Sequence, residues 1–126
     1  MNITQLENAV ETDKAYVYVF IRTDISLAQQ AVQVAHAAWH AGTAFGNNEE
    51  IPSVVLLSVA NREELEDAAA RLQRYGIDHY MFFEPDFGMG HSGLATRPVR
   101  VKKERHLMRK YPLYGTVAKE AGYAVA

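Results

Sequence analysis

Two short, unbroken runs of apolar residues constrain the fold of this chain more than any other feature. They are residues 16–21 (YVYVFI) and 54–59 (VVLLSV), both rich in β-branched or aromatic side chains. A strand with one exposed face alternates apolar and polar residues, so these runs indicate strands covered on both faces. A sheet covered on both faces needs helices on both sides, which predicts an α/β fold with three α/β/α layers.

Each run is followed by the start signals of a helix. After the first run, Ser26 or Asp24 can cap a helix that extends to about residue 41. After the second run, residues 61–64 (NREE) place acids in the first turn of a helix that extends to about residue 75. Two strand and helix pairs in succession favour parallel strands joined by crossover connections.

The later part of the chain predicts two more strands and a tail. Residues 79–83 (HYMFF) predict a third strand, and 93–101 a fourth whose far half Pro98 makes irregular. We expect a loop between them through Ser92, and short helices near 103–110 and 117–121. The whole predicts one domain over 1–126, with a core of about 14–101, a basic C-terminal segment 97–126, and a mixed, mostly parallel four-stranded sheet.

Several functional classes are excluded or disfavoured by composition. The chain has no cysteine, which excludes disulfides, thiolate metal sites and a cysteine nucleophile. No apolar run approaches the ~20 residues that span a bilayer. Residues 1–14 carry three acids and lack the basic-then-apolar order of a secretory signal. We therefore expect a cytoplasmic protein with no membrane partner.

The charge of the chain is concentrated in one segment. Residues 97–110 hold seven Lys or Arg and one Glu, which leaves six basic and fourteen acidic side chains elsewhere. Such asymmetry favours contact with a polyanion such as nucleic acid. A solvated basic helix face is the alternative interpretation.

His36 and His40 lie four residues apart on the first predicted helix, which puts both imidazoles on one face. A zinc site needs a third protein ligand, and Ala37 stands where the motif His-Glu-x-x-His has its glutamate. We therefore expect no metal, and a histidine pair that is packed or that presents His36, with Gln33, to a ligand. Trp39 is expected in the core, although an apolar dimer face is an alternative use.

Polar residues follow the first and third predicted strands, at 22–24 (RTD) and 84–86 (EPD). Ligand sites in open α/β sheets lie beyond the carboxyl ends of the strands, so we expect these segments to converge with the first turns of the first helix. Asp86, in a turn bounded by proline and glycine, is placed to act as a general base or to orient a ligand. A structural Asx turn is the more common explanation of an aspartate before Gly88.

Together these blocks resemble the type-II peptidyl-tRNA hydrolases, and more closely a branch of short proteins similar to them. They look like the family's strand ending in Arg-Thr-Asp-Leu, its helix carrying Ala-Gln-x-x-His-Ala, and the Glu-Pro-Asp-Leu turn of the short branch. The resemblance covers about residues 16–96 in the same order. The matching segments are 19–25 (VFIRTDI), 32–38 (VQVAHAA), 54–77 and 84–96 (EPDFGMGHSGLAT).

The resemblance implies a cofactor-independent hydrolase, often homodimeric, that cleaves the ester between a peptide or N-blocked aminoacyl group and tRNA with activated water. It implies catalytic roles for His36, Asp86 and Ser92. It implies substrate binding by Arg22, Asp24, Gln29, Gln33 and Thr96. The tRNA backbone would meet the basic residues that follow the last matching block, Arg97, Arg100, Lys102 and Lys103.

One alternative function stays open. Gln29 occupies the place of a family lysine, and Gly90 or Ser92, depending on the register, that of a family threonine. A non-catalytic RNA- or protein-binding module that keeps the same fold is therefore the second hypothesis.

Overall fold

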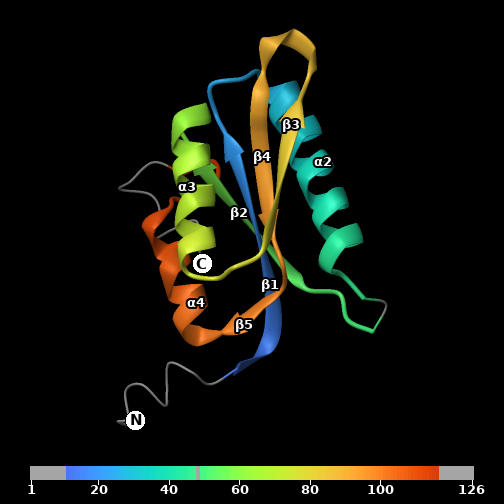
Figure 1. The fold of residues 1–126 in the computed structure, drawn as a ribbon, viewed down its shortest axis with the longest axis vertical. Helices are drawn as coiled ribbons and strands as arrows, with labels where there is room; N and C mark the ends of the chain where they lie inside the picture. Colours follow the sequence, from blue (N-terminus) through green and yellow to red (C-terminus); the bar gives the residue numbers. More distant parts are fainter. Residues whose placement is uncertain (1–10, 48, 117–126) are drawn as a thin grey trace.

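The computed structural model describes residues 11–47 and 49–116 (Figure 1). The predicted helix near 117–121 lies outside the described residues. The strands are β1 (Glu11–Arg22), β2 (Ser53–Val59), β3 (His79–Glu84), β4 (Gly90–Thr96) and β5 (Val99–Val101). The helices are α2 (Leu27–Phe45), α3 (Arg62–Arg74) and α4 (Lys102–Leu107), with 3-10 turns at Asp86–Gly88 and Met108–Lys110.

The strands form one mixed sheet in the order β2-β1-β4-β3, and β5 pairs with the amino-terminal part of β1. β1 and β2 pair in parallel, whereas β4 is antiparallel to both β1 and β3. The α/β class and the mixed sheet are confirmed. The expectation of four mostly parallel strands is wrong in its pairing, because β4 returns from β3 after only residues 85–89, a connection too short for a parallel crossover.

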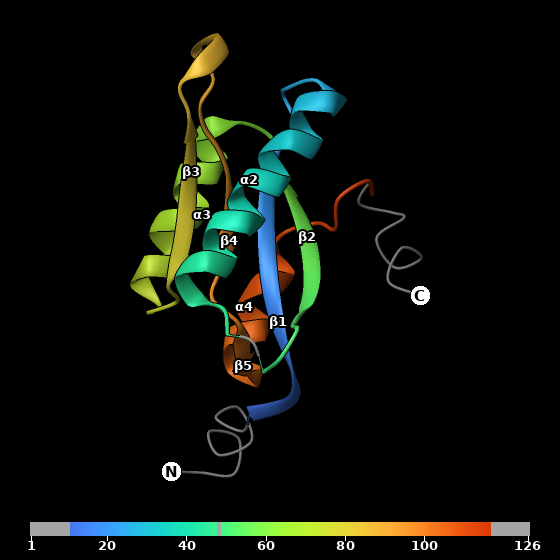
Figure 2. The same ribbon diagram turned by 90° about the vertical axis from the view of Figure 1, so that its right-hand side faces the viewer.

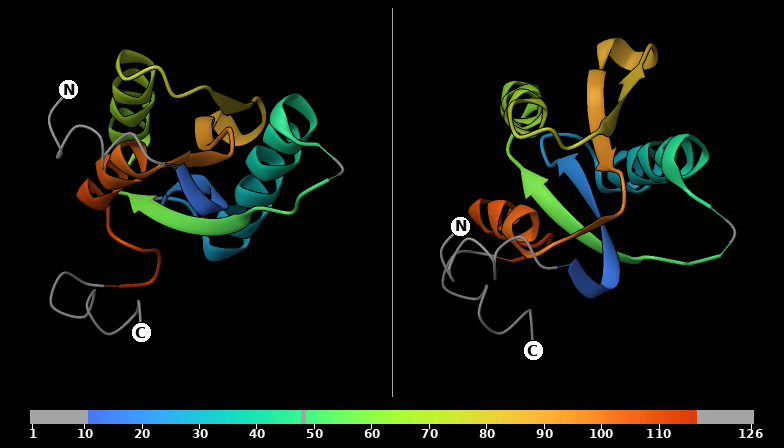
Figure 3. Two further views of the ribbon diagram at one scale, coloured as in Figure 1. Left: turned by 90° about the horizontal axis from the view of Figure 1, so that it is seen from below. Right: turned by 60° about the horizontal axis from the view of Figure 1, so that its bottom comes forward.

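Helices cover both faces of the sheet, as the unbroken apolar runs predict (Figure 3). On one face, α2 packs its small residues Ala37 and Ala41 against Val19 and Ala95. On the other face, α3 and the chain around α4 enclose a larger cluster, which contains Tyr18, Phe20, Leu57, Leu65, Leu72, Leu94 and Met108. Successive residues of β1 alternate between the two clusters, so the strand is buried from both sides.

α2 lies unusually close to the sheet at Gly93. A Cβ added to this glycine would approach the carbonyl oxygens of Phe20 and Gln33 to 3.2 and 3.3 Å. The small residues on the inner face of the helix allow this approach, and they leave no room there for a large ring. Trp39 accordingly lies on the outer side of α2 and is 76% exposed, so the expectation that it is a core residue is wrong.

Ser26, rather than Asp24, caps α2: its side chain accepts a hydrogen bond from the backbone N–H of Gln29. Asn61 caps α3 in the same way through the N–H of Glu64. None of the helices in the described part of the chain is long and apolar enough to cross a membrane.

Candidate functional site

The carboxyl ends of β1, β2 and β3 meet at one edge of the sheet, at the top of Figure 1. The backbone N–H of Thr23 donates to the carbonyl of Val59 at 2.9 Å, which joins the ends of β1 and β2. Nη1 of Arg22 donates to the carbonyls of Met89 and His91 at 2.8 and 3.0 Å, which joins β1 to the β3–β4 hairpin. The predicted convergence of segments 22–24 and 84–86 is therefore present.

Arg22 and Asp24, both predicted to bind substrate, bind each other. Nε and Nη2 of Arg22 donate to the two carboxylate oxygens of Asp24 at 2.6 and 2.9 Å. This hydrogen bonding, together with the charge of Arg22, holds the pKa of Asp24 below its usual value. Only 12% of the Arg22 side chain is exposed, and four of its N–H groups are engaged. Arg22 therefore acts as a brace that fixes the hairpin to the end of β1.

A buried amide links two of the matching segments, 32–38 and 84–96. Gln33, 1% exposed, donates from Nε2 to Gln29 Oε1 at 3.1 Å and to Glu84 Oε2 at 3.3 Å. Its Oε1 accepts from the fully buried Ser92 hydroxyl at 2.7 Å. Every hydrogen-bonding atom of the Gln33 side chain is thus used, and the proton of Ser92 is committed to it. We call these four residues the amide cluster; it locks α2 onto β3 and β4.

The amide cluster belongs to a regular series of side-chain contacts between α2 and β3, which run in opposite directions (Figure 2). His40 stacks on Tyr80 with ring centroids 4.9 Å apart, and His36 on Phe82 at 4.3 Å with nearly parallel planes. One helical turn advances 5.4 Å and two strand residues about 6.6 Å, so each turn of α2 meets the next inward residue of β3.

Both histidines of the predicted pair therefore stack on aromatic rings. His36 is exposed at the surface of this stack and makes no hydrogen bond with described residues. No group of three potential metal ligands occurs within residues 11–47 and 49–116.

Asp86 lies two residues after Glu84, beyond this series of contacts, at the tip of the β3–β4 hairpin. The hairpin tip that carries position 86 extends beyond the amino end of α2 (Figure 2). The residue opens a 3-10 turn in which Phe87 has a φ of 61°, a strained value for a side chain of this size. The Asp86 side chain is exposed and makes no hydrogen bond with any described residue, so the expected Asx turn is not formed. Within segments 22–24 and 84–86 it is the free carboxylate, since Asp24 and Glu84 are both engaged.

Thr96, also predicted to bind substrate, lies inside the sheet. Its hydroxyl accepts from the backbone N–H of Tyr18 at 3.0 Å and donates to the carbonyl of Arg97 at 2.8 Å. The residue is fully buried. Both hydrogen bonds hold the point at which the chain passes from β4 to β5.

The predicted nucleic-acid-binding cations lie at the opposite end of the sheet. Arg97 pairs with Glu104 at 2.9 Å, and Arg100 pairs with Glu50. The other two, the lysines that begin α4, are exposed and make no ion pair with described residues. β5 meets β1 at Tyr16, six residues before its carboxyl end, and at Glu11, so at least about 20 Å separates these cations from the carboxyl edge.

Sequence reasoning missed two polar contacts near this edge. Glu84 was considered only as part of a turn, although its two-residue spacing from Tyr80 and Phe82 places it on the α2 side of β3. Nδ1 of His91 lies 2.7 Å from Glu66 Oε2, a contact between β4 and α3 that no local pattern predicts. The hydrogen bond with His91, and a weaker one from Arg62, lower the pKa of Glu66.

Comparison with known proteins adds a fold neighbour. No family model matches the chain, and no curated protein matches it. Among solved structures, a protein of unknown function from Agrobacterium tumefaciens strain C58 is similar, with a TM-score of 0.61 and 14% sequence identity. The match covers 82% of this chain and 100% of that chain. At this identity the likeness concerns the fold only.

Proposed function

We propose that the protein hydrolyses the ester that joins a peptide or an N-blocked aminoacyl group to tRNA, at the carboxyl edge of the sheet. The observation that carries this proposal is the free carboxylate of Asp86, held on a braced turn where Asp24 and Glu84 are both engaged. The resemblance to peptidyl-tRNA hydrolases supports the same edge, because its three blocks supply the brace, the amide cluster and Asp86.

Asp86 would accept a proton from the water that attacks the ester carbonyl, and the ribose oxygen would leave with a proton returned to it. Arg22 and the amide cluster are positioning residues, since they fix the hairpin and α2 without reaching the reacting atoms. The hydroxyl of Ser92, committed to Gln33, belongs to this scaffold.

The amino end of α2 supplies a partner for negative charge on the carbonyl oxygen. The first N–H groups of a helix have no intrahelical acceptor, and the first turn of α2 carries no acidic side chain. Donors fixed in advance stabilise a developing oxyanion without reorganisation. His36, exposed on its stack with Phe82, is placed one to two turns along the same helix to contact the acylated end of the tRNA.

The RNA backbone would be held by the cations whose charge is free, Lys102 and Lys103, at the far end of the sheet. Such contacts position the RNA without reading its sequence, and they make its affinity fall steeply with salt. A structured RNA would span the separation of at least about 20 Å between these lysines and the carboxyl edge. The exposed Trp39 on α2 would serve as a homodimer surface, and a tRNA substrate would imply a cytoplasmic protein.

A non-catalytic RNA-binding module is the second candidate, and the amide cluster favours it. Gln29 is uncharged, and its Oε1 is occupied by Gln33. With Ser92 and Gln33 also saturated, the cluster offers few groups to a substrate. In such a module the fold and the two free lysines would be kept for binding alone.

The test is release of labelled N-acetylaminoacyl product from acylated tRNA at low salt. Asp86→Asn should lower turnover about 10²- to 10⁴-fold, the usual contribution of a general base. Asp78→Asn is the matched control, because Asp78 is an exposed aspartate at the other end of β3. Its turnover should equal that of the parent protein.

Three results would change the conclusion. Equal turnover of the Asp86 and Asp78 variants would remove Asp86 from the reaction. Tight, salt-sensitive tRNA binding without turnover by the parent protein would establish the binding module. If the parent protein neither bound tRNA nor turned it over, both candidate functions would be excluded.

A further inference from the structure

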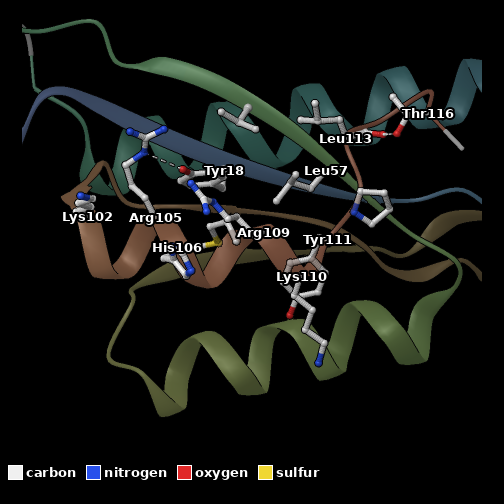
Figure 4. Close-up of a pocket in the computed structure, with 13 residues that line it drawn as sticks. Tyr18, Leu57, Lys102, Arg105, His106, Arg109, Lys110, Tyr111, Leu113 and Thr116 are labelled. Atoms are coloured by element: carbon white, nitrogen blue, oxygen red, sulfur yellow. Dashed lines mark hydrogen bonds between the residues drawn. The ribbon is translucent and has the colours of Figure 1, made fainter. Parts of the chain in front are cut away.

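A second concave site lies on the face of the sheet opposite α2. It is a cavity of about 780 Å³ between β1, β2 and the chain that follows β5 (Figure 4). This volume is within the range of small-molecule sites. Its floor is apolar and includes Val55, Leu57, Met108 and Leu113. It shares no residue with the carboxyl edge described above.

Cations form one wall of the cavity. Its lining contains no Asp or Glu, and it contains five basic side chains: Lys102, Arg105, His106, Arg109 and Lys110. These positions follow the i, i+3, i+4, i+7, i+8 spacing that gathers side chains on one face of α4 and the turn after it. Four of the five are Lys or Arg, so this wall is strongly positive above an apolar floor.

The walls of the cavity are fixed by interactions within the chain. Arg105 lies 3.6 Å above the ring of Tyr16, and its Nε donates to the hydroxyl of Tyr18 at 3.2 Å, which leaves its terminal nitrogens available. On the other side, the backbone N–H of Tyr114 donates to the Leu56 carbonyl at 2.9 Å. The N–H of Ser58 donates to the carbonyl of residue 112 at 3.0 Å, so residues 112–114 run along the edge of β2.

We propose that this cavity binds a small amphipathic anion, with an acyl or aryl body and a terminal carboxylate or phosphate. The aliphatic floor suits the body, and burying it there removes apolar surface from water. The terminal nitrogens of Arg105, with Arg109 and the two lysines, suit the anionic head through charge-assisted hydrogen bonds. A neutral apolar ligand would leave the cations uncompensated, and a simple anion would leave the floor in contact with water.

Displacement of the fluorescent probe 1-anilinonaphthalene-8-sulfonate from the full chain tests this proposal. Decanoate and decyl phosphate should both displace the probe, and their ratio identifies the preferred head group. Decanol and inorganic phosphate, which each carry half of the chemistry, should displace it at least about tenfold more weakly.

Two charge reversals on the same helical segment complete the experiment. Arg109→Glu should weaken decanoate binding by about tenfold or more, as expected for the loss of a hydrogen bond to a charged group. Lys103→Glu makes the same change in net charge at an exposed lysine that does not line the cavity, and it should leave the affinity within about twofold. Both substituted residues are exposed, and circular dichroism checks that the variants remain folded.

Several outcomes would overturn the proposal. Equal weakening by the two variants would show a diffuse charge effect. If decanol displaced the probe as well as decanoate does, the cavity would be merely apolar. If inorganic phosphate did so, it would be a simple anion site. Displacement by tRNA but not by decanoate would make the cavity part of an RNA surface. The measurement involves no ester hydrolysis, so its result is separate from that of the Asp86 experiment.

Discussion

The hydroxyl of Thr96 takes the place of a backbone acceptor in the sheet, and removing it gives a sharp prediction. β4 pairs with β1 at Val19 and beyond, and β5 pairs with β1 at Tyr16. The backbone N–H of Tyr18 falls between these two pairings, and Oγ1 of Thr96 accepts its hydrogen bond at 3.0 Å. The site is closed to solvent, so water cannot replace the hydroxyl.

Thr96→Val keeps the shape of the side chain and removes this acceptor. The N–H of Tyr18 is then buried without a partner, which costs about 1–3 kcal/mol of unfolding free energy. The hydrogen bond to the carbonyl of Arg97 is lost as well. A change of 1 kcal/mol shifts the melting temperature of a chain of this length by roughly 3–5 °C, so we expect a decrease of about 3–15 °C.

Urea unfolding followed by far-ultraviolet circular dichroism measures the loss, and Thr96→Ser is the matched control. The serine variant keeps the hydroxyl and loses one methyl group, so the amide of Tyr18 should stay protected from hydrogen exchange. In the valine variant that amide should exchange faster. A valine variant at least as stable as the serine variant, with the Tyr18 amide still protected, would refute this account of the sheet. Unchanged turnover per folded molecule in both Thr96 variants would show that the role of Thr96 is structural.

Two further predictions concern exposed features of the chain. Arg22 holds the carboxylate of Asp24 charged in the folded state, so this contribution to stability is present above the unfolded pKa and disappears as pH falls through the lowered folded pKa. The difference in unfolding free energy between the parent and Asp24→Asn should therefore narrow below about pH 4, and a constant difference from pH 7 to pH 2 would contradict the pairing. Trp39→Ser, at an exposed position, should change the stability of a monomer by no more than about 0.5 kcal/mol, and a larger loss that depends on protein concentration would indicate a dimer through α2.

The layers of the fold were predictable because a strand buried on two faces appears in the sequence as a continuous apolar run. The apolar runs predicted β1 and β2, although β2 is an edge strand in which only Leu57 and Val59 are buried, so the expectation that it is covered on both faces is wrong. The capping side chains Ser26 and Asn61 marked the starts of both long helices. The start of β4 was less visible, since its first residue, Gly90, looks like part of a loop. Its φ of 72° shows that the glycine is needed at the entry to the strand, where a Cβ would also meet Arg62.

The place of the site was predictable from strand ends, but the partners of its side chains were not. Local sequence identifies Arg22 and Asp24 as polar groups at the edge, and it does not reveal that they neutralise each other. The same holds for Arg97 and Arg100, whose carboxylate partners come from α4 and from the loop before β2. A charge cluster in a sequence therefore overstates the free charge on the surface, because pairing depends on which elements the fold brings together.

The proposed role of Asp86 depends on the contacts that fix the β3–β4 hairpin. The lack of a hydrogen-bond partner for its carboxylate is a weaker argument. An exposed aspartate without a hydrogen bond costs nothing, since water solvates it. A short turn at the tip of a hairpin would, however, move freely unless other contacts fixed it. Here two hydrogen bonds from Arg22 and one from Gln33 to Glu84 fasten the hairpin beside its turn, and the turn keeps Phe87 in a strained conformation. Backbone strain persists only where the surrounding structure fixes it, so the brace and the strained Phe87 are the observations on which the proposed role of Asp86 rests.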